Sequence, residues 1–450
     1  MIRALYSLLT WLAQPFLRRK LARRARAEPG YAVAVEERFG HYSVPPESGR
    51  LWIHAVSLGE ARAAGILLEA LRPAWPGLRL LLTHGTATGR AEGARLLQAG
   101  DLHAGDLQVW QPWDTPQAVA RFLAHFQPCM GILMETEVWP NLIAGCASRG
   151  VPVALANARL NERSFRQAQR LAALARPAYG ALAAVWAQTD ADAARLRALG
   201  ANVAGVFGNL KFDATPDADQ VDTGRRWREA LGGPVILLAS SREGEEAAFL
   251  KLISALPSVQ WPQGAMKNEV ISGGDRGHGG ARVRWLIVPR HPQRFDEVAQ
   301  CVSAHGLALS RRSTWGDRSL PQPAAGEAGE MVWLGDSMGE MALYYAMSDV
   351  ALLGGSFEPL GGQNLIEAAA CGCPVVMGPH TFNFAQAAER AEAAGAAATV
   401  PDLAAAVQRA LAWAGDPAER ARRAAAALAF AAAHRGAARR TAQAIVDLPR

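Results

Sequence analysis

Cysteine is scarce in this 450-residue sequence, and this scarcity excludes a fold held together by disulfides. The five cysteines are odd in number and scattered, which is typical of a reducing compartment: Cys129, Cys146, Cys301, Cys371 and Cys373. Cys371-Gly-Cys373 resembles half of a metal site, but no CxxC or HxxxH motif completes it. We therefore predict buried structural thiols, no metal and no cofactor.

Long apolar runs are also missing. The apolar run at residues 4–17 is shorter than the roughly 20 residues that span a bilayer unaided. Half of the residues are hydrophobic and a fifth are charged, which is the balance of a folded globular protein and excludes a disordered chain. A length of 450 residues predicts two domains of about 200 residues each.

Acidic residues are absent before Glu28, whereas seven basic residues precede it: Arg3, Arg18, Arg19, Lys20, Arg23, Arg24 and Arg26. The other 40 basic residues face 41 acidic ones, so the net charge of +6 comes from this arm. The body of the protein is nearly neutral, which argues against nucleic acid as a partner.

Residues 1–27 combine this basic cluster with the apolar run, which carries Tyr6, Trp11 and Phe16. The combination predicts an N-terminal membrane anchor, either interfacial or a short signal-anchor. An amphipathic helix docked on the protein's own surface is the alternative. Because the charges follow the apolar run, a cleaved signal peptide is disfavoured, and we expect the cytoplasmic side of a membrane.

Short apolar runs alternate with helical stretches along the chain. Such runs indicate strands that are buried on both faces, and helices between them imply a parallel sheet. The predicted strands are 51–56, 78–83, 107–111, 130–134, 151–156, 183–187, 203–207, 235–239, 285–288, 331–334, 350–353 and 375–377. We predict an α/β fold with two Rossmann-like, doubly wound domains, 28–212 and 234–450, joined by a linker at 213–233. Ligands are expected in the cleft between the two domains.

Two segments lack this pattern, the Gly-rich residues 259–281 and the Pro/Gly/Ala-rich residues 311–329. We interpret the first as a surface insertion and the second as a loop, and expect no chemistry in either. The Ala-rich residues 403–444 predict helices, which in this architecture often pack back across both domains.

Three segments of the second half predict a nucleotide-sugar site. Residues 354–370 form a Gly-rich turn that follows a strand and opens a helix, where backbone N–H groups favour an anion. Asn364 lies in this turn, and Glu367 could accept hydrogen bonds from a ribose diol. Residues 288–292 and 335–340 also follow strands and offer an arginine, a serine and backbone N–H groups to a phosphate.

The first half carries carboxylates at predicted strand ends. Glu60 follows a strand through a Ser-x-Gly-Glu turn. It is either a first-turn carboxylate favoured by the helix dipole or a general base that deprotonates an acceptor hydroxyl. Residues 134–141 place two carboxylates at another strand end, and Lys211 comes just before the predicted linker.

These segments together resemble the Kdo (3-deoxy-D-manno-octulosonic acid) transferases of Gram-negative lipopolysaccharide synthesis. The resemblance runs from the N-terminal apolar segment almost to the C-terminus. Its motifs are HAVSLGE, METEVWPNL, ANARL, GNLKFD, VPRHP, GDSMGE, GGSFEPLGGQN and MGPHTFNF. The resemblance implies a GT-B fold and an inverting transfer of Kdo from CMP-Kdo to lipid IVA at the cell inner membrane. It implies no metal.

The resemblance also implies residue roles. The position of Glu60 is that of the catalytic base, and Glu135 and Lys211 occupy positions assigned to transition-state stabilisation. The implied contacts to CMP are Pro289, Arg290, Met338, Gly339, Glu340, Asn364, Leu365, Ile366 and Glu367. The chain departs from many relatives at Gln363, where they carry histidine, and at Ser240-Ser-Arg242, where they often read Ser-Thr-His.

Two other functions are compatible with the same motifs. A nucleotide-sugar epimerase on this fold would need a base beside the donor sugar and has no use for a basic anchor. An inactive, nucleotide-binding membrane scaffold would have no need of Glu60, Glu135 and Lys211.

Overall fold

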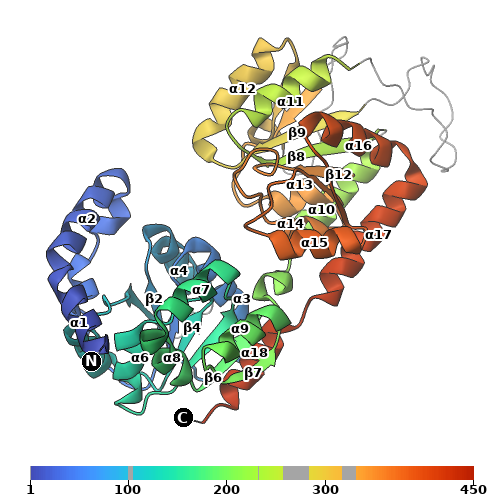
Figure 1. The fold of residues 1–450 in the computed structure, drawn as a ribbon. Helices are drawn as coiled ribbons and strands as arrows, with labels where there is room; N and C mark the ends of the chain where they lie inside the picture. Colours follow the sequence, from blue (N-terminus) through green and yellow to red (C-terminus); the bar gives the residue numbers. More distant parts are fainter. Residues whose placement is uncertain (1, 100–104, 232, 257–282, 317–330, 450) are drawn as a thin grey trace, which may run out of the picture. The chain divides into compact units, whose positions relative to one another are not determined.

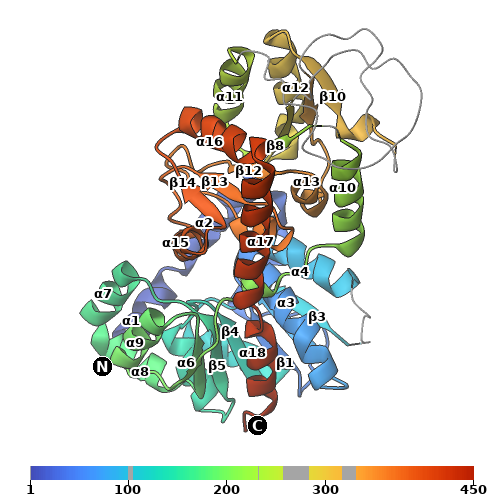
Figure 2. The ribbon, with the colours of Figure 1, turned by 90° about the vertical axis from the view of Figure 1, so that its right-hand side faces the viewer.

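The protein is represented by a computed structural model that describes residues 2–99, 105–231, 233–256, 283–316 and 331–449. The chain forms two compact units (Figures 1 and 2). The first comprises Met1–Asp213 and His434–Arg450, and the second comprises Ala214–Ala433. The predicted insertion at 259–281 lies outside the described residues, as does most of the predicted loop at 311–329.

The first unit contains a parallel seven-stranded sheet in the order β3-β2-β1-β4-β5-β6-β7. Every residue of β1, β2, β4, β5 and β6 is buried, which explains why these strands read as continuous apolar runs. The strands are β1 (Leu51–His54), β2 (Leu80–His84), β3 (Leu107–Trp110), β4 (Met130–Met134), β5 (Val153–Ala158), β6 (Ala184–Ala187) and β7 (Val203–Val206). All seven strands predicted in this part of the chain are confirmed.

Helices cover both faces of this sheet, because successive side chains of a strand point to opposite faces. Leu51 and Ile53 join one buried cluster with α3 and α18, and Trp52 joins the other with α5, α6 and α9. The α-helices are α1 (Ile2–Leu12), α2 (Gln14–Ala27), α3 (Leu58–Ala74), α4 (Ala87–Ala99), α5 (Pro116–Phe126), α6 (Pro140–Ala147), α7 (Glu162–Arg170), α8 (Ala172–Gly180), α9 (Asp190–Ala198) and α18 (Ala437–Val446). The 3-10 turns are η1 (Pro29–Ala32), η2 (Val35–Phe39) and η3 (Leu210–Asp213).

The second unit repeats the plan, with a parallel sheet in the order β10-β11-β9-β8-β12-β13-β14. The strands are β8 (Val235–Ser241), β9 (Arg284–Pro289), β10 (Ala308–Arg311), β11 (Met331–Leu334), β12 (Val350–Leu353), β13 (Val375–Met377) and β14 (Ala397–Thr399). The five predicted strands are confirmed, and β10 and β14 are additional. Both additional strands are short and lie at the edges of the sheet, where they are partly exposed and lack an apolar run.

The helices of this unit are α10 (Ala218–Ala230), α11 (Glu245–Ser254), α12 (Phe295–Ala304), α13 (Met341–Ala346), α14 (Leu365–Ala370), α15 (Ala385–Ala393), α16 (Leu403–Gly415) and α17 (Pro417–Ala433). The 3-10 turns are η4 (Pro292–Arg294) and η5 (Arg312–Thr314). An α/β architecture with two parallel sheets is therefore confirmed.

The prediction of buried thiols holds for Cys371 and Cys373, which are at most 5% exposed.

The boundaries of the two units differ from the predicted domains. Most of the predicted linker 213–233 is the helix α10, which belongs to the second unit. The predicted second domain included residues 434–450, but α18 packs against α3 in the first unit (Figure 2). Ala438, Ala442 and Ile445 fill the core beside β1, and an Ala-rich helix does not reveal in its sequence which sheet it will cover.

The predicted anchor forms two helices, α1 and α2. Large apolar side chains of α1 are more than half exposed: Ile2, Leu5, Leu8, Leu9, Trp11 and Leu12. The opposite side of α1 is held by hydrogen bonds, from Tyr6 Oη to Asp114 Oδ2 at 2.9 Å and from Ser7 Oγ to Asn141 Oδ1 at 2.9 Å. Among the described residues, no helix has the length and apolar character needed to cross a bilayer.

Candidate functional site

Each sheet has a topological switch point, where ligands of doubly wound folds bind at the carboxyl ends of the strands. In the first unit the chain runs outward from β1 through β2 to β3 and then returns to β4 on the other side of β1. In the second unit the corresponding pair is β8 and β12. The predicted residues Glu60 and Glu135 follow β1 and β4, and the predicted Gly-rich turn follows β12.

Glu60 lies in the first turn of α3, and two donors hold its carboxylate. Val56 N–H donates to Oε2 at 2.8 Å and Ser57 Oγ to Oε1 at 3.0 Å, while Ser57 caps the helix by accepting Glu60 N–H. The pKa of Glu60 is raised to about 7, mainly by burial and also by the charges of Glu135 and Glu137, and against the lowering effect of these two bonds. Glu60 is therefore both a capping residue and a carboxylate able to exchange a proton near neutral pH.

Glu135 and Lys211 form an ion pair next to this carboxylate. Glu135 Oε1 lies 3.4 Å from Lys211 Nζ, and both side chains are mostly buried. Glu135 has a φ of 58°, a left-handed conformation that is costly for a residue with a side chain. Its N–H donates to Ala156 O and its carbonyl accepts Arg159 N–H, so two backbone bonds hold it in place.

Asn157 fixes the turn that carries Lys211. β4 and β5 pair Met134 with Ala156, so Glu135 and Asn157 are neighbours at the sheet edge, and Asn157 also has a left-handed φ of 51°. Asn157 is 2% exposed, and its Oδ1 accepts Leu210 N–H at 3.0 Å. The sequence did not identify Asn157 as a site residue, because its role depends on the register of two strands.

The other end of the turn η3 is tied to the C-terminal helix. The Asp213 carboxylate accepts the N–H groups of Gly436 and Ala438, the second at 2.7 Å. These groups open α18, so Asp213 satisfies a helix N-terminus that would otherwise lack acceptors. Lys211 is therefore held between β5 and a helix that begins more than 220 residues later.

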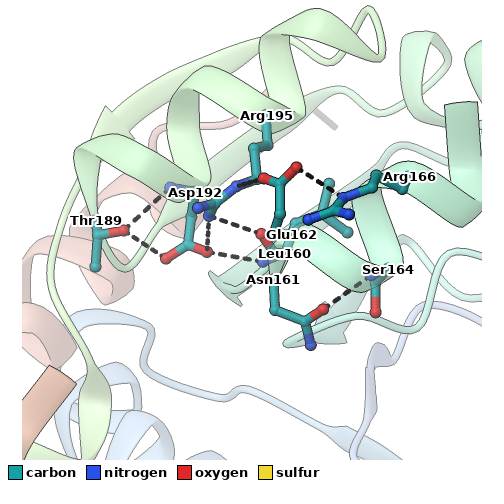
Figure 3. A network of polar contacts seen from close by, with 8 residues as sticks. All are labelled: Leu160, Asn161, Glu162, Ser164, Arg166, Thr189, Asp192 and Arg195. Atoms are coloured by element: carbon teal, nitrogen blue, oxygen red, sulfur yellow. Dashed lines mark hydrogen bonds and ion pairs between the residues drawn. The ribbon is translucent and has the colours of Figure 1, made fainter. Parts of the chain in front are cut away.

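A polar network secures the loop that follows β5 (Figure 3). Asp192 accepts Leu160 N–H at 2.9 Å and the Thr189 hydroxyl at 2.6 Å, and Arg195 donates to Leu160 O at 3.0 Å. Glu162 accepts from Arg166 and Arg195, which joins α7 to α9. The network holds residues 160–164, which follow the ANARL strand end directly.

Glu137 is a third carboxylate in this region. Burial raises its pKa, a hydrogen bond from Trp139 Nε1 at 2.8 Å lowers it, and the charge of Glu135 raises it. The predicted pair of carboxylates at residues 134–141 thus consists of one glutamate paired with Lys211 and one bound to an indole. The first of them shares its charge with the lysine.

In the second unit, Pro289 and Arg290 lie at the carboxyl end of β9, where Arg290 N–H donates to Ser241 O at 3.0 Å. The adjacent His291 is surrounded by positive charge. Burial lowers the pKa of His291, and Arg242, Arg290 and Arg294 lower it further. Such a concentration of guanidinium groups at a sheet edge favours an anionic ligand.

The loop after β11 contains Met338, Gly339 and Glu340. Met338 is 65% exposed, and Gly339 has a φ of 82° with no atom within 4 Å of an added Cβ. Glu340 accepts from Arg312 Nη2 at 2.7 Å and from the Ser337 hydroxyl. Arg312 lies at the start of the loop in which no chemistry was expected, and its contact with Glu340 is an ion pair.

The Gly-rich turn leads from β12 into α14. Asn364 caps α14, with its Oδ1 accepting Ile366 N–H at 3.1 Å, and Glu367 lies in the first turn. Leu365 and Ile366 are 1% exposed, so only their backbone groups can meet a ligand. The predicted donor residues thus follow β9, β11 and β12, at the same edge of one sheet.

The two sets of residues offer different chemistry. The first unit holds a carboxylate whose pKa is near neutrality beside a lysine–glutamate pair, and the second lines a sheet edge with arginines and backbone N–H groups. No group of three or more His, Cys, Asp or Glu side chains able to hold a metal occurs within the ranges that the structure describes.

Comparisons with known proteins point to one family. Residues 34–214 match the family described as 3-Deoxy-D-manno-octulosonic-acid transferase (kdotransferase). The chain is 47% identical to the 3-deoxy-D-manno-octulosonic acid transferase of Bordetella pertussis over 99% of both chains.

Two solved structures share the fold. A glycosyltransferase from Rickettsia africae matches with a TM-score of 0.54 at 12% identity, covering 88% of this chain and 97% of its own. UDP-GlcNAc 2-epimerase from Neisseria meningitidis, bound to UDP-GlcNAc, matches with a TM-score of 0.52 at 14% identity, covering 89% and 99%. A transferase and an epimerase match about equally well, so the fold does not separate these two functions.

Proposed function

Because the chain belongs to the 3-deoxy-D-manno-octulosonic acid transferase family, we propose that it transfers Kdo from CMP-Kdo to lipid IVA with Glu60 as the base. It is a glycosyltransferase of lipopolysaccharide synthesis. The observation that carries the proposed mechanism is the Glu60 carboxylate, which is held by two donors and has a pKa raised to about 7.

In this mechanism Glu60 removes the proton from the acceptor hydroxyl as its oxygen attacks the anomeric carbon of Kdo. CMP leaves, and the configuration at that carbon inverts in one displacement. A base with a pKa near the working pH is available in its ionised form and still accepts a proton effectively. Ser57 and Val56 fix the direction of the carboxylate, so the proton acceptor needs little reorganisation.

Lys211 and Glu135 act on the charges that develop during the displacement. The cation of Lys211 suits negative charge on the departing phosphate, and Glu135 suits an oxocarbenium-like anomeric centre. Their contact at 3.4 Å keeps both groups in fixed positions before substrate arrives. The nearby Asn157 and Asp213 support this pair through the turn η3.

The donor is assigned to the second unit. Arg290 and the backbone N–H groups at the start of α14 suit the phosphate of CMP, and Glu367 suits the ribose hydroxyls. Gly339 gives a ligand access to the backbone of its loop, because nothing lies within 4 Å of its missing side chain. A GT-B arrangement, in which both sets of residues serve one substrate cleft, is part of this proposal.

We assign the protein to the cytoplasmic face of the inner membrane, where a lipid acceptor is found. Support comes from the exposed apolar side chains of α1 and from the arginines and lysine of α2, which suit an anionic lipid surface. The hydrogen bonds of Tyr6 and Ser7 fasten α1 to the unit that carries Glu60.

The decisive experiment is a transfer assay with the purified full chain in detergent, CMP-Kdo generated in situ and tetra-acylated lipid A precursor. The wild type should give product, whose mass counts the sugars added, and Glu60→Gln should lose at least about a hundredfold in kcat. Glu69→Gln, which removes an exposed carboxylate from the same helix, is the matched control and should be fully active.

Absence of product from a folded wild type that binds CMP would contradict transferase activity. An active Glu60→Gln would retain the function and reject Glu60 as the base. The epimerase alternative predicts interconversion of a nucleotide sugar without any acceptor, which the same assay detects when the lipid is omitted.

A further inference from the structure

Arg242 lies at the switch point of the second sheet. It follows β8 directly, and the Gly-rich turn 354–363 follows the neighbouring strand β12. The chain leaves β8 toward β9 and returns on the opposite side to form β12. Side chains at this point of a doubly wound sheet are placed to meet a bound ligand.

A buried glutamate fastens the two loops together. Glu245 is 4% exposed and accepts Gly355 N–H at 2.8 and 2.9 Å and Arg242 N–H at 2.8 Å. A Cβ at Gly354 would lie 2.6 Å from Ser240 O, so the loops approach as closely as glycine allows. The position of Arg242 relative to the turn is therefore fixed by backbone contacts.

Arg242 and Gln363 flank the same glycine. A Cβ built on Gly355 would lie 3.4 Å from Arg242 Cγ and 3.5 Å from Gln363 Nε2, which is ordinary contact distance. These are two of the positions at which the sequence departs from the motifs of its relatives. In the folded chain both side chains therefore border the backbone of Gly355.

Arg242 and Arg294 differ in whether carboxylates lie close enough to neutralise their guanidinium groups. Arg294 pairs with Glu246 at 2.7 Å and with Glu297 at 2.8 Å, which neutralises it. Arg242 is half-buried, and no carboxylate of the described residues comes within ion-pair distance of its guanidinium. A half-buried cation without a counter-charge favours binding of an anion.

We propose that Arg242 is a donor-binding residue whose guanidinium holds an anionic group of the nucleotide sugar, with Gln363 as a neighbouring hydrogen-bond donor. This proposal rests on the proposed function. CMP-Kdo carries two such groups, the phosphodiester and the carboxylate of the sugar, and the planar guanidinium matches either with two parallel hydrogen bonds.

The test is Arg242→Gln in the full chain, with dissociation constants for cytidine and CMP and the KM for CMP-Kdo. If Arg242 binds the phosphate, affinity for CMP falls by about tenfold to a hundredfold and cytidine is unaffected. If Arg242 binds the carboxylate, CMP is unaffected and the KM for CMP-Kdo rises by a similar factor. Either result supports the proposal.

Unchanged values for both CMP and CMP-Kdo would overturn it. Arg226→Gln is the matched control, because it removes an exposed guanidinium from α10 in the same unit. Arg242→Lys retains the charge and should recover part of the affinity, which separates loss of the ligand contact from loss of folding. A wild type that binds neither CMP nor CMP-Kdo would instead refute the proposed function.

Discussion

Glu60 should give the reaction its pH dependence. Burial raises its pKa to about 7, so the ionised base is a minor form at pH 6 and the major form at pH 8. We expect kcat/KM for the acceptor to rise about tenfold per pH unit below 7 and to level off above it. Glu60→Gln should show a low, flat profile. A wild-type profile that is flat from pH 6 to 8 would contradict this role.

The same carboxylate should cost stability. Its pKa is higher in the folded chain than the ordinary value of 4.5, so the folded state binds more protons, and stability falls as pH rises from about 4.5 to about 7. Glu60→Gln removes an ionisation cost on the order of 3 kcal/mol. We expect the variant to melt above the wild type at pH 8 but not at pH 4.5. Equal melting differences at both pH values would reject the assignment of the pKa.

Asn157 should control the placement of Lys211 without touching substrate. Asn157→Gly keeps the left-handed backbone but removes the acceptor of Leu210 N–H. We expect kcat to fall about tenfold with an unchanged KM for CMP-Kdo, because a buried N–H without a partner costs about 1–3 kcal/mol and releases the turn. Asn161→Ala, which removes an exposed helix cap in the same loop, should leave kcat unchanged. If both variants lose activity equally, Asn157 has no special role.

At the scale of whole elements, α18 should support the site through Asp213. Asp213→Asn weakens the bonds to the opening N–H groups of α18 and should lower stability by about 1 kcal/mol. Asp217→Asn is the matched control, because Asp217 caps α10 with one bond at 3.0 Å. Both variants should melt slightly earlier, and only Asp213→Asn should lower kcat, since Lys211 lies on the same turn. A normal kcat for Asp213→Asn would show that the position of η3 does not affect catalysis.

Some strands of the fold could be predicted from the sequence and others could not. Strands buried on both faces read directly as apolar runs, whereas the edge strands β10 and β14 do not, because half-exposed strands tolerate polar residues. Glu60 could be identified as a candidate site residue, because it follows a predicted strand through a local Ser-x-Gly-Glu turn. Asn157 and Asp213 could not be identified in this way, because their hydrogen-bond partners lie in distant segments of the chain and no local sequence pattern predicts such contacts.

At the scale of the whole molecule, the proposed lipid acceptor raises the question of how an enzyme with a nearly neutral body reaches a membrane. Its excess positive charge is confined to α1 and α2, with six of the seven basic residues on α2, and the exposed apolar side chains of α1 precede them in the chain. Arg18 is already engaged by Glu36 and stacks on Phe39 at 3.6 Å, so it also serves to hold α2 on the body. Other basic residues of α2 are exposed and lack an ion pair among the described residues: Arg19, Lys20 and Arg23.

We therefore predict that replacing Arg19, Lys20 and Arg23 together by Gln weakens binding to vesicles of anionic lipid by about a hundredfold, since each contributes about 1 kcal/mol near such a surface. Vesicles of neutral lipid should bind both proteins equally weakly, and added salt should remove the difference. Because these residues lie on α2 and not on the elements that carry Glu60 and Lys211, kcat with acceptor in detergent micelles should be unchanged. A loss of kcat in micelles would mean that α2 acts on the site itself, whereas unchanged vesicle binding would assign the attachment to the apolar face of α1 alone.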